Sequence, residues 1–163
     1  MGNTAPFLLP KAPKPKRARA RVEPEISWTH VPRIEPGQYP ARSRKANVYF
    51  DRQFKRWVCA VQFDVLDSSL VEVIASLTWF LNLGPREKPK ATRRSKFWTA
   101  CLKANGGQPK RRDRITARIF EGRYAVVRVE DTRKNHRQIA VNRDECYSVI
   151  RDVIEWQTGG PSR

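Results

Sequence analysis

Apolar and polar residues alternate in several stretches of this chain, a pattern that predicts β-strands. The alternation is clearest over residues 54–66, where apolar side chains are interleaved with Arg56, Gln62 and Asp64. We expect one face of this strand to point into the core, and that face carries Trp57, Cys59, Val61, Phe63 and Val65.

A second strand is predicted over residues 38–50, directly after the turn signal of Pro36 and Gly37. Its apolar residues change phase along the strand. One face carries Tyr39 and Ala41, and the other carries Ala46, Val48 and Phe50. Such a phase change indicates a β-bulge or a bend, which strands need when they curl into a small barrel.

Residues 70–83 fit two patterns. A strand would place on one face Val71, Val73, Ala75, Leu77, Trp79 and Leu81. A helix would place on one face Leu70, Val73, Ile74, Leu77 and Leu81. The high content of β-branched and aromatic residues favours the strand, and the helix stays open as the alternative.

An amphipathic helix is predicted over residues 92–105. Thr92 is placed to cap its first turn, and Gly106 and Gly107 follow its last residue, Asn105, where helices commonly stop. The apolar stripe of this helix consists of Phe97, Trp98, Cys101 and Leu102.

The last third of the chain predicts a hairpin and a final element. Residues 115–120 and 124–130 are expected to pair around Glu121 and Gly122, and 139–141 is a loop or a weak strand. Residues 147–156 predict a C-terminal helix, with a bulged final strand as the alternative. The helical spacing is that of Val149, Ile150, Val153 and Ile154.

These elements predict a β-rich α+β fold, either an OB-like small barrel or a curved antiparallel sheet, with one prominent helix over 92–105. The length of 163 residues suits one domain plus a tail. We expect residues 1–25, which contain five prolines, to form a disordered basic arm. Residues 26–157 form a single globular nucleic-acid-binding domain in this prediction, and 158–163 a frayed tail.

Positive charge is concentrated in two blocks. Residues 11–21 hold six Lys or Arg and no acid, and residues 84–118 hold twelve against Glu87 and Asp113. These blocks account for sixteen of the seventeen formal net charges. Charge confined to patches is typical of proteins that bind a polyanion, and nucleic acid is the polyanion that we expect.

A single-strand binder needs cations along the backbone of the nucleic acid and flat rings on which bases stack. The candidate cations of the domain are Arg93, Arg94, Lys96, Lys103, Lys110, Arg111, Arg112 and Arg114. The candidate stacking rings are Trp98, Trp79 and Tyr49. The arm would add further phosphate contacts through Lys14, Lys16, Arg17, Arg19 and Arg21.

Other chemistry finds less support in the sequence. The carboxylates Asp64, Asp67 and Glu72 lack the spacing of a nuclease centre, and no phosphate-binding glycine loop is present. We therefore expect no enzyme activity, no metal and no cofactor. Three widely spaced cysteines favour a reducing compartment, and no apolar run is long enough for a bilayer, so we expect a cytoplasmic protein.

Short motifs follow one another in a distinctive order: a G-x-Y-x-A strand, a strand ending in F-x-V, an N-L-G segment, a helix ending in A-x-G, and an F-x-G-R turn before V-x-V. They are carried by Gly37, Tyr39, Ala41, Phe63, Val65, Asn82, Leu83, Gly84, Ala104, Gly106, Phe120, Gly122, Arg123, Val127 and Val129. This order resembles small proteins of bacteriophage and integrated mobile-element replication and recombination modules. The resemblance implies an OB-like single-strand-binding or accessory protein.

The sequence thus predicts a non-catalytic single-stranded DNA-binding protein that serves replication or recombination of a phage or mobile element. RNA is a second ligand that fits, and replication or recombination proteins are the expected partners. Two alternatives stay open. One is a protein-interaction module whose basic face meets an acidic partner, and the other is a metal-dependent DNA-processing enzyme that uses Asp64 or Glu72.

Overall fold

The computed structural model of the chain describes residues 33–157, with the exception of 86 and 136. The predicted basic arm with its cations, residues 26–32 and the predicted C-terminal tail lie outside the described residues. The described residues form five strands, one α-helix and two short 3-10 helices, joined by loops. In chain order they are β1 Gly37–Asp51, β2 Arg56–Leu66, β3 Val73–Gly84, α1 Lys96–Asn105, η1 Ala117–Phe120, β4 Tyr124–Asp131, η2 Arg143–Glu145 and β5 Ser148–Trp156.

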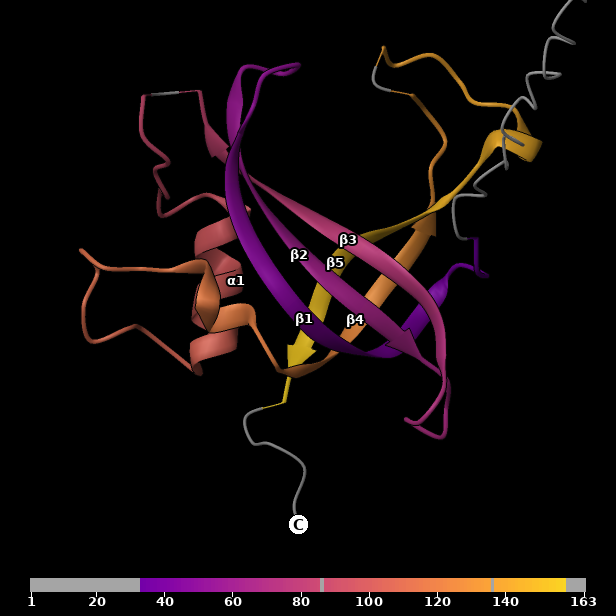
Figure 1. Cartoon of the computed structure of the whole chain (residues 1–163), viewed down its shortest axis with the longest axis horizontal. Helices are drawn as coiled ribbons and strands as arrows, with labels where there is room; N and C mark the ends of the chain where they lie inside the picture. The colour runs from indigo at the N-terminus through magenta and orange to yellow at the C-terminus, as the bar shows by residue number, and fades with distance from the viewer. Residues whose placement is uncertain (1–32, 86, 136, 158–163) are drawn as a thin grey trace, which may run out of the picture.

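The strands form one antiparallel sheet in the order β3-β2-β1-β4-β5. Three strands joined by hairpins are followed by a fourth that returns beside the first, which is the Greek-key arrangement. The sheet is strongly curved, so that β1, β2 and β3 cross β4 and β5 at a steep angle (Figure 1). β3 and β5 are its two edges and no ladder joins these two strands, so the structure is a curved sheet and not a closed barrel.

A register shift in β1 produces this curvature. Residues 37–42 of β1 pair with β4, whereas residues 41–51 pair with β2, and the pairing with β2 shifts between Ser43 and Ala46. The change of apolar phase in the sequence predicted this irregularity. Because of the shift, the buried residues of β1 are Ala41, Ser43 and Ala46, and one strand serves both halves of the sheet.

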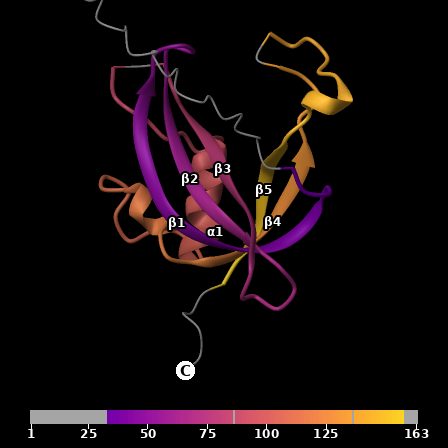
Figure 2. The same ribbon diagram turned by 45° about the vertical axis from the view of Figure 1, so that its right-hand side comes forward.

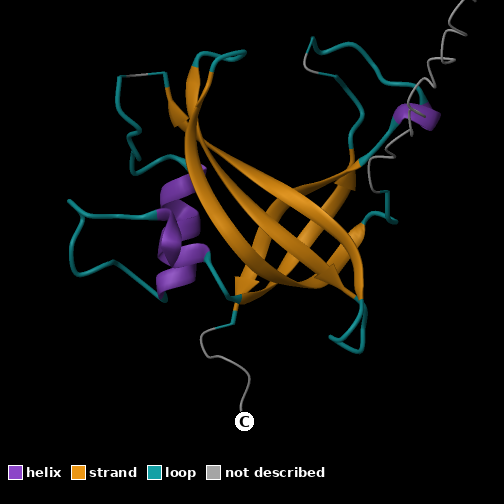
Figure 3. Ribbon diagram, viewed as in Figure 1, coloured by secondary structure: helices purple, strands orange, loops and turns teal. Residues whose placement is uncertain are grey.

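The core lies in the concave side of the sheet and is closed at one end by α1. The helix packs against β3, β5 and η1, and lies to one side of the strands in Figure 3. Rings fill the centre: Phe120 stacks on Trp156 at 5.5 Å between centroids and meets Phe97 edge-on at 5.7 Å. Cys59 and Cys101 are also fully buried, and this burial raises the pKa of both thiols to about 12.

Residues 147–156 do not form the predicted helix. The alternative, a bulged final strand, is confirmed as strand β5. The pairing of β4 with β5 shifts between Val126 and Val127 and again between Arg128 and Val129. Each shift changes the alternation, so the buried apolar residues of β5 fall three apart, at Ile150, Val153 and Trp156. A doubly bulged strand therefore imitates the spacing of a helix. The strand predicted over 70–83 is confirmed as β3.

The predicted hairpin around Glu121 and Gly122 is also wrong in its first half. Residues 117–120 form the 3-10 turn η1, which carries the fully buried Phe120 into the core. β4 pairs instead with β1 and β5. Residues 139–141 contribute only an isolated bridge between Lys134 and Ala140.

The helix is shorter than predicted at its start. The side chain of Ser95, and not Thr92, caps it, because Ser95 Oγ accepts a hydrogen bond from the backbone N–H of Trp98 at 3.2 Å. At the other end Gly106 adopts φ +69°, and the N–H of Gly107 donates to the carbonyl of Leu102. Among the described residues no helix has the length and apolar character that crossing a membrane requires.

The observed cap can be separated from the predicted one by substitution. Ser95→Ala should lower the free energy of unfolding by about 1 kcal/mol, because the first turn loses an acceptor. Thr92→Ala is the matched control and should change it by less than about 0.5 kcal/mol. Urea unfolding followed by tryptophan fluorescence measures both, and a larger loss for Thr92→Ala would contradict the assignment.

Candidate nucleic-acid interface

The outer face of β1, β2 and β3 presents exposed rings over a floor of small apolar side chains. Tyr49 on β1 lies opposite Val58 of β2, and Phe80 on β3 lies opposite Ala60 of β2. Tyr49 is 42% exposed and Phe80 is 59% exposed, whereas Val58 beneath them is buried. Both rings are therefore accessible to a flat ligand on the solvent side of the sheet.

A groove runs beside Phe80, and we call it the sheet groove. It has a volume of about 680 Å³ and lies between the outer face of β2 and β3, the start of α1 and strand β5. Four cations line it and no carboxylate does. The lining residues are Arg56, Val58, Phe80, Asn82, Leu83, Gly84, Lys90, Thr92, Ser95, Lys96 and Arg151.

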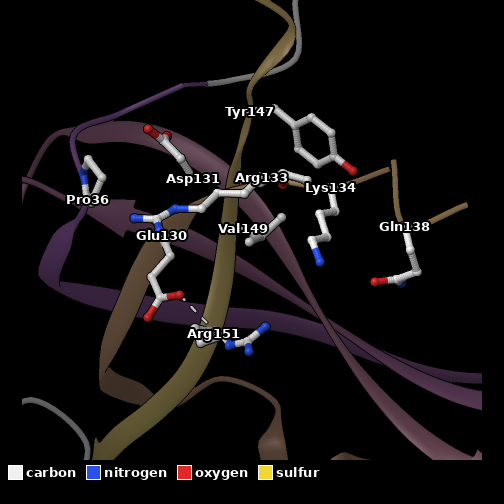
Figure 4. A pocket seen from close by; sticks show the side chains of 10 residues that line it. Pro36, Glu130, Asp131, Arg133, Lys134, Gln138, Tyr147, Val149 and Arg151 are labelled. Carbon is white, nitrogen blue, oxygen red and sulfur yellow. Dashed lines mark ion pairs between the residues drawn. The ribbon is translucent and has the colours of Figure 1, made fainter. Parts of the chain in front are cut away.

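The sheet groove continues into a second hollow, the hairpin pocket, of about 720 Å³. Arg151 lines both. Figure 4 shows Tyr147, Lys134 and Gln138 on one side of the β5 ribbon, with the ion pair of Arg151 and Glu130 at the lower end of the pocket. The lining residues are Pro36, Glu130, Asp131, Thr132, Arg133, Lys134, Gln138, Tyr147, Val149 and Arg151.

Tyr147 also lines a third hollow between the β1–β2 and β4–β5 loops, to which Gln53, Phe54 and Asn135 contribute. These two loops rise on the same side of the sheet in Figures 1 and 2. Shared residues therefore connect the three hollows into one concave track, from the start of α1 to the β1–β2 loop.

Ion pairs reduce the negative charge along this track. Glu130 lies 3.8 Å from Arg151, and Asp131 accepts two hydrogen bonds from Arg33, the shorter at 3.1 Å. The hairpin pocket also holds Arg133 and Lys134. Among the lining residues of the sheet groove and of the hairpin pocket, Lys and Arg outnumber Asp and Glu. This excess of positive charge favours the binding of phosphates.

The predicted cations are divided by the fold. Lys96 lines the sheet groove, and Arg93 and Arg94 are exposed beside its lining residues Thr92 and Ser95. Lys103 is used internally, because its ammonium donates to the carbonyl of Val153 at 3.3 Å and tethers α1 to β5.

The remaining predicted cations, Lys110, Arg111, Arg112 and Arg114, lie on the loop that follows α1. Arg111 pairs with Asp113 at 2.8 Å, and Arg112 donates to the side chain of Gln108. Arg112 lines a fourth hollow, with Val48 and Phe97, and this hollow shares Leu83 and Lys90 with the sheet groove. Lys110, Arg111 and Arg114 line none of these four hollows.

The predicted rings are divided as well. Tyr49 is exposed on the outer face and Trp98 is half-buried on α1. Trp79, in contrast, is 3% exposed and packs edge-on against Phe63 and Phe120, so it belongs to the core and is unavailable to a base. Its neighbour Phe80, which the sequence reasoning passed over, takes the outer face. The strand phase of residues 70–83 was the signal that distinguishes the two.

Arg56, Arg151 and Tyr147 were not chosen as candidates from the sequence, because the order of the strands brings them to the track. Lys90 was not chosen either, although it lies in the basic block at 84–118.

The candidate carboxylates of a nuclease have structural partners. Asp64 accepts a hydrogen bond from Ser76 Oγ at 2.9 Å and pairs with Arg44 at 3.6 Å. Within the described residues no three His, Cys, Asp or Glu side chains are grouped so as to hold a metal ion.

The sequence matches no protein-family model, and no curated protein is significantly similar to it. The resemblance to phage and mobile-element proteins rests on short motifs. Several glycines of these motifs have a structural role. Gly84, Gly106 and Gly122 all have positive φ, at the ends of β3 and α1 and in the turn before β4. Backbone conformation therefore explains why these three motif positions are glycine.

The assignment of Trp79 to the core and of Phe80 to the surface is testable. Trp79→Ala should lower the free energy of unfolding by about 3–5 kcal/mol, because it leaves a cavity between two rings. Phe80→Ala should lower it by less than about 1 kcal/mol, since its ring is largely in solvent. Urea titrations of the two variants decide the point. Similar losses would mean that both rings belong to the core.

Proposed function

We propose that this protein binds single-stranded nucleic acid, in the first place DNA, without catalysing a reaction, and that the strand lies in the sheet groove. The observation that carries the proposal is the lining of that groove. It combines four cations and no carboxylate with an exposed ring, Phe80, over a floor of small apolar side chains.

The chemistry of the groove favours a single strand over a duplex. A base stacked on a ring contributes about 1–3 kcal/mol, and any base can do so because each has an aromatic face. In a duplex those faces are already covered by neighbouring base pairs. Arg56, Lys90 and Lys96 are placed to neutralise phosphates beside the stacked base. The result is affinity without marked sequence preference.

We interpret the fold as OB-like, that is, as a partly open Greek-key barrel of five strands. Such folds bind oligonucleotides on the face of the second and third strands, between the β1–β2 and β4–β5 loops. The sheet groove lies on β2 and β3, and the third hollow lies between these two loops, which supports the interpretation. By the motif resemblance we assign the protein to phage or mobile-element replication and recombination.

The free cysteines Cys59, Cys101 and Cys146 support a cytoplasmic location for this activity. A second function, binding of an acidic protein partner, is favoured by one observation: Lys110, Arg111 and Arg114 of the loop after α1 are exposed and line none of the three hollows of the track. A nuclease has less support, since Asp64 and Asp67 already accept hydrogen bonds from their neighbours.

Ring and charge can be tested separately by fluorescence anisotropy with a labelled oligo-dT. Phe80→Leu should weaken binding by roughly tenfold, because an apolar side chain without a ring cannot stack. Phe80→Tyr keeps the ring and should stay within about twofold of the wild-type affinity. Equal losses in both variants would show that Phe80 does not stack on bases.

Salt dependence tests the cations. With four groove cations engaged, log K should fall against log salt with a slope of about −3 between about 50 and 300 mM. Lys96→Ala should reduce the slope by about 0.7. The matched control is Arg111→Ala, which should leave the slope unchanged, because Arg111 pairs with Asp113 and lines none of these hollows. A slope near zero, or equal affinity for a duplex of the same length, would contradict the proposed function.

A further inference from the structure

An asparagine lies directly beside the exposed ring of the sheet groove. Asn82 and Phe80 are two residues apart on β3, both are exposed, and both line the groove. Side chains two apart along a strand point to the same face, with their Cα atoms about 7 Å from each other. The amide of Asn82 is therefore a neighbour of any base that stacks on Phe80, on the side of the base and not above it.

The backbone fixes the orientation of this amide. The pairing of β3 with β2 is irregular here, because Leu83 is an extra residue between the paired residues Asn82 and Gly84. The N–H of Gly84 donates to Oδ1 of Asn82 at 2.8 Å. An amide can accept such a bond only through its oxygen, so its nitrogen, with two N–H donors, is left for a ligand. In the described part of the chain this nitrogen makes no hydrogen bond.

The other polar groups of the groove are charged or serve the helix. The hydroxyl of Ser95 donates to the carbonyl of Thr92 at 2.7 Å and accepts from the N–H of Trp98, at the start of α1. The four cations are suited to phosphate oxygens, with which they form charge-assisted hydrogen bonds. Of the β2 and β3 residues that line the groove, only Asn82 has a neutral polar side chain. It is the group best placed to contact the edge of a base.

A group that can only donate distinguishes bases by what their edges present. Thymine and guanine carry a carbonyl oxygen where cytosine and adenine carry an amino group. A carbonyl that faces the nitrogen of Asn82 accepts a hydrogen bond. An amino group in the same place leaves two donors facing each other, and each loses an acceptor that water would supply.

We propose that Asn82 contacts the edge of the base that stacks on Phe80 and favours a carbonyl over an amino group there. This inference rests on the proposed function. It adds a modest preference at one nucleotide to the general affinity of the groove for single strands. Thymine and guanine are the bases that fit this position.

Anisotropy titrations with oligo-dU and oligo-dC of equal length test the proposal, in slightly alkaline buffer that keeps cytosine neutral. The two bases have the same size, and uracil has a carbonyl where cytosine has its amino group. The wild type should bind oligo-dU about fivefold more tightly, as expected for one hydrogen bond gained against one donor left unpaired. Asn82→Asp keeps an acceptor for the N–H of Gly84 and replaces the donors by an oxygen, so it should remove or reverse the preference.

Asn47→Asp is the matched control for the added negative charge. Asn47 is exposed on the same face of the sheet, opposite Ala60, and does not line the sheet groove. This variant should weaken the binding of both strands equally and keep the ratio at about five. A wild type that binds the two strands equally, as it would if the amide bonded a phosphate, overturns the proposal, and so does a ratio that survives Asn82→Asp.

The two levels of the account fail differently. Where the ratio is one but Phe80→Leu still weakens binding, the role of Asn82 is rejected and the proposed function stands. Where neither strand binds, both are rejected.

Discussion

β1 can belong to both halves of the sheet because its register shifts between Ser43 and Ala46. The shift is held in place by the chain before β4. Ser43 is fully buried, its hydroxyl donates to the carbonyl of Phe120, and its oxygen accepts from the N–H of Arg123 at 2.9 Å. The N–H of Ala46 donates to the carboxylate of Glu121 at 3.0 Å. The backbone of Ser43 is also paired with this segment, because its N–H donates to the carbonyl of Arg123 at 2.8 Å and its carbonyl accepts from the N–H of Gly122 at 3.1 Å. Backbone groups at the bulge of β1 thus have partners outside the ladder with β2.

Several features follow from this bend. It places Phe120 in the centre of the core, where it meets rings from α1 and β5. It also brings edge strand β3 close to edge strand β5, so that Arg151 and Phe80 line the same groove although seventy-one positions separate them. The surroundings of the two ends of β3 differ in charge. Four cations line the groove beside its second half. The turn before its first half has exposed apolar side chains, the acids Asp67 and Glu72, and no cation.

The sequence was sufficient where one side-chain pattern decides the structure. Alternation predicted β2, the change of phase predicted the bulge at residues 43–46, and Gly106 marked the end of α1. It was insufficient where tertiary pairing changes the local pattern. Two register shifts give the buried residues of β5 the spacing of a helix. The strand predicted over 115–120 is replaced by η1, which brings Phe120 into the core.

For the candidate site as well, the sequence predicted some of the residues and not others. Charge counting located Lys96 and its neighbours, because a dense basic block needs no knowledge of the fold. Arg56 and Arg151 come from strands far apart in the sequence, and only the order of the strands places them in one groove. The choice of Trp79 as a stacking ring conflicted with the strand phase, which places Trp79 on the same face as Leu77 and Leu81. The phase was already readable in the alternation of Ala75, Leu77 and Leu81.

The central claim is that a single strand lies on the outer face of β2 and β3. The most direct test is photocrosslinking of an oligonucleotide that carries 5-bromodeoxyuridine, with the modified residues located by mass spectrometry. The account predicts crosslinks at Phe80 on the sheet groove and at Tyr147 farther along the track. Crosslinks confined to the loop at 108–114, or to the hairpin tip at 70–74, would contradict it.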